Sequence, residues 1–246
     1  MTEAIPAATL VLFRESADGA EHLFVERAAT MVFAGGAVVF PGGRVDPGDY
    51  EAAKRFPALD PDDAAARIAA IRETVEEAGI AVAFDGPVDV ESIRTALHGG
   101  ATMGDLLDTH GLKLDLDKLV PFARWRPNFK ETRTFDTRFY LARVEAGHAE
   151  ARVDRTENVH LFWETAAKVL ALADDRKVKI IFPTRRNLER LATLEGFDTA
   201  KAHALAHPVE TITPQVEERN GIRHLCIPDG LGYPVISEEL STAMRG

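Results

Sequence analysis

Three glutamates near the end of a predicted helix constrain the fold and chemistry of this chain more than any other feature. Glu73, Glu76 and Glu77 fall within the segment 72–80, directly before Gly79. At about 100° per residue, positions i, i+3 and i+4 of a helix lie on one face. Carboxylate oxygens are the ligands that hard divalent cations prefer. The spacing therefore predicts a helix with one face able to bind such a cation.

The bounds of this helix follow from its end residues. Asp60 is a favourable N-cap, Pro61 a favourable first helical residue, and Gly79 a plausible first residue beyond the C-terminus. An apolar stripe points nearly opposite to the glutamates; its members are Ala64, Ile68, Ile71, Val75 and Ala78. We therefore expect one face of the helix to pack on a core and the other to be free for a ligand.

The alternative for the glutamates is that they form an ordinary solvated helix face. Two features of the segment argue against it. Acids in the last turn oppose the helix dipole, at about 0.3–1 kcal/mol each, and Glu73 and Glu77 repel each other at i, i+4. Arg72 can reach Glu76 from the same helix. A bound cation would relieve the repulsion, so the helix alone leaves both the solvated face and the metal site open.

A glycine-containing loop precedes the helix. The apolar segment 36–40 is predicted to be a strand, and Pro41, Gly42 and Gly43 follow it. Adjacent glycines permit positive φ angles and a close approach of the backbone to a ligand. Free N–H groups in such a loop can face a phosphate or a metal-bound water.

Together, the loop and the helix resemble the Nudix hydrolases, whose box reads G-x5-E-x7-R-E-U-x-E-E-x-G-U, with U a bulky apolar residue. The matching residues are Gly43, Arg72, Glu73, Glu76, Glu77, Gly79 and Ile80. Asp49 stands at the position of the first glutamate, and Thr74 stands at an apolar position. Between Asp49 and Arg72 lie 22 residues instead of seven, an insertion of 15 at about 50–64.

Further segments are similar to the branch of the family related to the peroxisomal CoA diphosphatases. That branch carries a larger insertion at the same place and phrases similar to segments 133–139 and 183–188. CoA-cleaving members also carry an upstream pattern, L-L-T-x-R-[SA]-x3-R-x3-G-x3-F-P-G-G. Arg27 matches its first arginine, whereas Val25 replaces the threonine and Val32 the second arginine. Arg27 is therefore either a substrate-binding residue or a surface or structural cation, and both interpretations stay open.

The resemblance implies metal-dependent hydrolysis of a diphosphate linkage in a nucleotide derivative, CoA or acyl-CoA among them. ADP-ribose or another nucleoside-diphosphate derivative is the alternative substrate, and a catalytically inactive ligand-binding module is the alternative of another class. Glu73, Glu76 and Glu77 would hold Mg²⁺ or Mn²⁺, and Arg72 would orient a glutamate. The water's proton would go to Glu76, Glu77 or another acid, Glu157.

Four more residues complete the predicted site. Gly42 and Gly43 would shape the loop beneath the ions, and Asp49 stands at a box position. Arg133, in a region of aromatic residues and arginines that begins at Trp125, could hold a phosphate while an adenine stacks nearby. The alternative for this region is a packed strand with exposed charges.

Composition limits the partners. The net charge of −10 argues against nonspecific binding of nucleic acid, although it allows a small anionic substrate. The one cysteine, Cys226, cannot form an internal disulfide and is typical of the cytoplasm. The apolar segment 7–13 is too short to span a membrane. A homodimer is the default expectation for a soluble enzyme.

The pattern of elements predicts an α/β fold. Predicted strands cover 8–13, 22–26, 36–40, 80–84, 119–125, 135–144 and 159–163, and predicted helices cover 91–97, 103–110, 165–174, 183–194 and 199–206. An extended pair, 210–217 and 222–228, follows. We expect a Nudix-like α/β/α sandwich with a mixed sheet in residues 1–175, and a helical and extended C-terminal extension, 176–246, packed on it.

Overall fold

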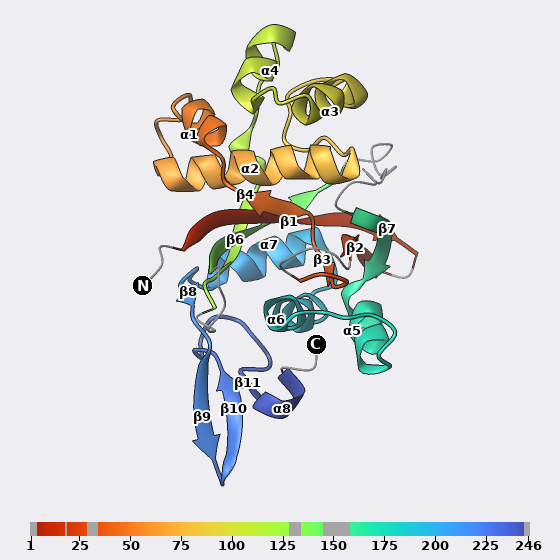
Figure 1. The fold of residues 1–246 in the computed structure, drawn as a ribbon, viewed down its shortest axis with the longest axis vertical. Helices are drawn as coiled ribbons and strands as arrows, with labels where there is room; N and C mark the ends of the chain where they lie inside the picture. Colours follow the sequence, from red (N-terminus) through yellow and green to blue (C-terminus); the bar gives the residue numbers. More distant parts are fainter. Residues whose placement is uncertain (1–3, 18, 29–33, 128–133, 145–157, 244–246) are drawn as a thin grey trace.

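A mixed sheet between two helical layers forms the body of the protein (Figure 1). The computed structural model describes residues 4–17, 19–28, 34–127, 134–144 and 158–243. The strands follow the order β3-β2-β1-β6-β5-β8, with β4 paired to β1 and β7 paired to β2. Their bounds are β1 Ile5–Ser16, β2 Gly19–Arg27, β3 Val38–Val39, β4 Gly42–Arg44, β5 Val120–Trp125, β6 Phe135–Arg143, β7 Asn158–Thr165 and β8 Thr211–Ile212. The predicted α/β class with a mixed sheet is confirmed.

The central strands β1 and β6 run parallel, and the other pairs are antiparallel except β5 with β8. Side chains of β1 alternate between the two faces of the sheet. Leu10 and Leu12 belong to one buried hydrophobic cluster, and Val11 and Phe13 belong to the other. Both faces of this strand are therefore core, which explains its nearly continuous apolar sequence.

The first helical layer covers one face of the sheet and contains α1 Pro47–Ala53, α2 Pro61–Ala78, α3 Val90–His98 and α4 Met103–His110 (Figure 1). The predicted bounds of α2 are confirmed: Asp60 accepts a hydrogen bond from the Asp63 N–H at 3.0 Å, and Gly79 has a φ of 65°. The predicted strand at 80–84 is wrong. Within it only Phe84 finds a strand partner, in a single bridge to Leu114.

The acidic face of α2, predicted to be free for a ligand, is partly covered by neighbouring elements. Buried residues surround this helix, among them Ala66, Ala70 and Thr74, because α1 and α3 pack against it in addition to the sheet. The side chains of Glu73 and Glu76 are 17% and 21% exposed, and Glu77 is buried. The glutamates therefore lie in a largely enclosed environment rather than on an open surface.

The second helical layer lies on the opposite face and contains α5 Ala166–Asp174, α6 Phe182–Leu191 and α7 Phe197–Ala206 (Figure 1). Side chains from the C-terminal part of the chain, such as Leu188, Ala200 and Leu225, share a hydrophobic cluster with Phe13 and Phe122 of the sheet. The C-terminal part thus packs directly on the sheet. A domain boundary at 175/176 stays a prediction.

A small three-stranded sheet follows the second layer, and its hairpin projects from the body (Figure 1). It contains β9 Gln215–Arg219, β10 Ile222–Cys226 and β11 Ser237–Glu239, and α8 Leu240–Ala243 comes after it. The predicted extended pair is confirmed, and Cys226 is buried on β10. None of the helices in the described ranges has the length and hydropathy that crossing a membrane requires.

Candidate metal and active site

The glycine loop lies directly against the glutamates of α2. The N–H of Gly42 donates a hydrogen bond to Oε2 of Glu77 at 2.9 Å. A Cβ atom on Gly43 would overlap the carboxylate of Glu73, and one on Gly42 would overlap the carbonyl of Ala8. Close approach, rather than a positive φ angle, is therefore the reason that glycine is needed at both positions.

A single guanidinium joins the acidic residues of the site. Nη1 of Arg72 donates to Oε1 of Glu73 at 2.8 Å and to Oε2 of Glu76 at 2.9 Å. Its Nε and Nη2 donate to the two oxygens of Asp49 at 3.1 and 3.0 Å, and Nη2 also reaches the carbonyl of Arg44 at 2.8 Å. Arg72 thus orients two glutamates rather than one, and it ties them to the loop and to α1.

Asp49 is a buried structural residue of the site. Its side chain accepts a hydrogen bond from the N–H of Asp46 at 2.9 Å and closes the first turn of α1. Burial raises the pKa of Asp49, and the hydrogen bond and charge of Arg72 oppose this shift. The acid at the first-glutamate position therefore holds the arginine of the box in place.

The electrostatics of the cluster disfavour the ionised form of Glu73 and Glu76, chiefly because both side chains are largely buried. Burial raises the pKa of Glu73 to about 8; Arg72 opposes that shift, and the negative charges of Glu77 and Glu76 add to it. Burial also raises the pKa of Glu76, against the effect of Arg72. Burial lowers the pKa of Arg72, but its bonds to Asp49 and the charge of Glu73 outweigh this and raise it overall. An additional cation would stabilise the ionised carboxylates.

The donor chemistry of the cluster fits a hard divalent cation, because its donors are carboxylates: Glu73 and Glu77 lie against the loop, and Arg72 joins Glu76 to Glu73. Among the residues that the structure describes, no group of three or more His, Cys, Asp or Glu side chains has the arrangement of metal ligands. Instead, Arg72 engages one oxygen each of Glu73 and Glu76, and the Gly42 N–H engages one oxygen of Glu77.

Arg94 is a residue of the site that the sequence analysis missed. It lies on α3, is buried, and donates from Nε to the carbonyl of Glu76 at 2.9 Å and from Nη2 to that of Glu77 at 3.3 Å. It follows Glu77 by 17 residues in another helix, and no local motif connects the two. Only the packing of α3 on α2 reveals the contact.

The remaining predicted residues differ in what the structure says of them. Arg27 ends β2 beside β3 and β7, and its Nε is buried without an acceptor in the described part of the chain. Arg133 and Glu157 lie outside the described residues. Trp125 is buried and donates to the hydroxyl of Tyr233 at 3.1 Å, so it is a packed strand residue and no platform for an adenine.

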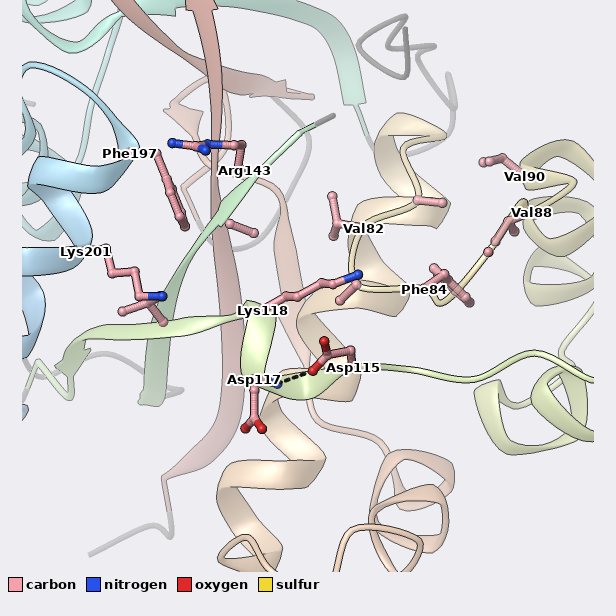
Figure 2. Close-up of a pocket in the computed structure, with 15 residues that line it drawn as sticks. Val82, Phe84, Val88, Val90, Asp115, Asp117, Lys118, Arg143, Phe197 and Lys201 are labelled. Atoms are coloured by element: carbon pink, nitrogen blue, oxygen red, sulfur yellow. Dashed lines mark hydrogen bonds between the residues drawn. The ribbon is translucent and has the colours of Figure 1, made fainter. Parts of the chain in front are cut away.

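A separate pocket of about 360 Å³ is lined in part by residues of the segment that follows α2 in the chain, such as Val82 and Phe84 (Figure 2). Its walls combine apolar side chains, such as Phe84 and Phe197, with charges of both signs, among them Asp117, Lys118 and Arg143. None of the predicted site residues lines it. The candidate active site is therefore the contact between the glycine loop and α2, and this pocket is distinct from it.

The fold and part of the sequence are shared with a solved enzyme. A NUDIX hydrolase from Alicyclobacillus acidocaldarius is 33% identical, with a TM-score of 0.73 over 82% of this chain and 97% of that one. A MutT protein from Methanosarcina mazei Go1 is 14% identical (TM-score 0.47, covering 78% and 96% of the two chains). The NUDIX domain of Shewanella oneidensis NrtR complexed with ADP ribose is 13% identical (TM-score 0.44, 77% and 86%).

Neither a family model nor a curated protein matches the sequence. The Alicyclobacillus structure supports assignment of this chain to the same family, since its identity and its coverage of both chains are high. The box residues Gly43, Arg72, Glu73, Glu76 and Glu77 meet in one cluster, as the resemblance to the family implied. The chain belongs to the Nudix hydrolase family.

Proposed function

We propose that this protein hydrolyses the diphosphate linkage of CoA or acyl-CoA with the help of Mg²⁺ or Mn²⁺. The observation that carries the proposal is that Glu73 and Glu77 lie against the loop at Gly42 and Gly43, while Arg72 joins Glu76 to Glu73. This cluster has carboxylate oxygen donors and little exposure. Those are the properties of a site that binds a divalent cation together with a phosphate.

The chain's own residues would then have distinct roles. Glu73, Glu76 and Glu77 would hold the cation, which supplies positive charge for the phosphate oxygens and acidifies bound water when it is present. Arg72 keeps the carboxylates of Glu73 and Glu76 oriented. Asp49 in turn fixes Arg72. The Gly42 N–H orients Glu77.

The reaction breaks one P–O bond of the diphosphate and forms a P–O bond to water. The proton of the attacking water would pass to a glutamate of the box. Glu157 is the alternative acceptor on the basis of the family resemblance, and it lies outside the described residues. Positioning and charge neutralisation account for most of the rate in chemistry of this class.

Arg27 supports the choice of CoA. Its match to the upstream pattern of CoA-cleaving enzymes is a sequence feature, and its buried Nε is a donor without an acceptor in the described ranges. Buried donors normally have partners, so a phosphate of the substrate is a fitting acceptor. We assign Arg27 to the binding of a substrate phosphate. Arg133 would be a second contact of the same kind.

A second candidate is hydrolysis of ADP-ribose or a related nucleoside-diphosphate derivative. The observations that favour it are Val25 and Val32, which replace the threonine and the second arginine of the CoA pattern. The loss of that arginine removes a bidentate phosphate contact. Both candidates use the same cluster of glutamates and differ only in the group beyond the diphosphate.

The test is a substrate panel with Mg²⁺ and Mn²⁺, read by the masses of the products. We expect CoA to give 3′,5′-ADP and 4′-phosphopantetheine at a higher kcat/KM than any other compound. AMP and ribose 5-phosphate from ADP-ribose, with CoA intact, would favour the second candidate. Tight binding of a diphosphate without turnover would instead identify an inactive ligand-binding module and contradict the proposal.

A further inference from the structure

The C-terminal end of α2 needs a cation that the helix itself does not provide. The last four carbonyls of a helix have no partner within it, and they carry partial negative charge. The last turn of α2 contains no basic residue, and Glu76 and Glu77 add full negative charges there. Without compensation, this end is the place where the helix would fray.

Arg94 provides the missing cation from a neighbouring helix. Its side chain donates to the carbonyls of Glu76 and Glu77, the residues whose side chains are the proposed ligands. Arg94 is 7% exposed, so solvent screens its charge only weakly. Since the guanidinium is planar, two hydrogen bonds to successive carbonyls fix the orientation of the peptide groups between them.

We propose that Arg94 is a positioning residue for the cation site, an inference that rests on the proposed function. By holding the last turn of α2, it keeps the Cα–Cβ bonds of Glu76 and Glu77 directed at the glycine loop. Arg72 orients the carboxylate of Glu76 from the side-chain end, and Arg94 fixes the same residue from the backbone end. Loss of Arg94 should therefore loosen the ligands while leaving them chemically intact.

If Arg94 only stabilised the fold, its replacement would lower stability without a specific effect on cation binding. Arg67 is a suitable arginine for comparison. Arg67 is also a buried arginine of this layer, on α2 itself, and it donates to the carbonyls of Leu116 and Leu119 at 2.7 and 2.6 Å. It lies in the N-terminal half of α2, away from the box. Replacing Arg67 should destabilise the protein about as much as replacing Arg94, without disturbing the glutamates.

The experiment measures Mn²⁺ affinity by electron paramagnetic resonance for the full chain and for Arg94→Met, Arg94→Lys and Arg67→Met. Methionine keeps much of the apolar stem and removes the charge. We expect Arg94→Met to raise the Kd for Mn²⁺ about tenfold, as is usual when a residue behind the ligands is lost. Lysine, which keeps the charge and one donor contact, should restore part of the affinity. Arg67→Met should lower the melting temperature and leave the Kd unchanged.

Turnover of the preferred substrate gives a second readout. Arg94→Met should lower kcat about tenfold and change KM less than threefold, because the ligands rather than the substrate contacts are loosened. The inference is overturned if Arg94→Met binds Mn²⁺ as tightly as wild type, or if Arg67→Met weakens binding equally. A wild-type protein that binds no Mn²⁺ would contradict the proposed function, and the inference with it.

Discussion

The carboxylate of Asp49 accepts two hydrogen bonds from the guanidinium of Arg72, at 3.1 Å from Nε and 3.0 Å from Nη2. Both side chains are buried, so the pair is shielded from solvent. Asp49 stands where the Nudix box has its first glutamate, ahead of the insertion. The contact shows that α1 and α2 bring the two halves of the box together across the added residues.

Asp49→Asn should destabilise the protein. The substitution leaves Arg72 buried with less compensating charge, and we expect a loss of about 2 kcal/mol in the free energy of unfolding. Urea denaturation at pH 7 measures it. The control is Asp108→Asn, which removes the charge paired with Arg55 on the exposed surface and should cost much less. Equal losses in the two variants would contradict the role of the buried pair.

Gly43→Ala should disable the site. The added Cβ would overlap the carboxylate of Glu73, which must then move away from the loop. We expect kcat and Mn²⁺ affinity to fall at least about tenfold. In the matched control, Gly104→Ala on α4, the added Cβ would lie 3.7 Å from that of Ala52, an ordinary contact, and activity should stay at the wild-type level. An active Gly43→Ala protein would show that the close approach is unimportant.

Features set by neighbouring residues could be predicted from the sequence. The bounds of α2 follow from Asp60 and Gly79, because capping depends on residues adjacent in the chain. The gathering of the glutamates follows from the helical repeat. A contact between these glutamates and the glycine loop was expected from the family resemblance, and the structure bears it out for Glu73 and Glu77.

Features that depend on tertiary packing could not be predicted. The apolar run 80–84 reads as a strand, but its side chains are buried in the first helical layer and only Phe84 pairs. Nothing in the sequence says that α1 and α3 pack against α2, so the partial burial of Glu73 and Glu76 could not be predicted. Nothing in the sequence indicates that Arg94 contacts α2, because an arginine on a short helix is usually solvated.

Arg27→Met should weaken substrate binding more than turnover. If its guanidinium binds a phosphate of CoA away from the reacting bond, its loss removes one charged hydrogen bond, and we expect KM for CoA to rise about tenfold. The change in kcat should stay within threefold. Steady-state kinetics with CoA gives both values. Arg14→Met, on the neighbouring strand β1, serves as the control and should leave KM unchanged; an unchanged KM in Arg27→Met would remove Arg27 from the substrate site.

His22 should make stability depend on pH below neutrality. Burial lowers the pKa of His22 from 6.5 to about 4, against the effect of its hydrogen bond to the carbonyl of Leu12. The unfolded chain therefore takes up a proton at a higher pH than the folded one, and stability is lost as the pH falls from 6.5 toward 4. Between pH 7 and pH 5 this residue should account for a loss of about 2 kcal/mol.

Denaturation of His22→Asn at both pH values checks this expectation. Asparagine keeps a donor near Leu12 but does not titrate. Between pH 7 and pH 5, the free energy of unfolding of the variant should therefore fall by about 2 kcal/mol less than that of wild type. His160→Asn, at an exposed position, should follow wild type. A His22→Asn protein with the wild-type pH dependence would show that another group is responsible.

Anomalous diffraction from crystals soaked in Mn²⁺ tests the central claim most directly. We predict a peak at roughly 2–2.5 Å from carboxylate oxygens of Glu73, Glu76 and Glu77, beside the loop at Gly42 and Gly43. Crystals of the Glu76→Gln, Glu77→Gln double variant, soaked in the same way, should show a weaker peak or none. If wild-type crystals show no peak among these carboxylates, even with a diphosphate compound present, the proposed cation site does not exist.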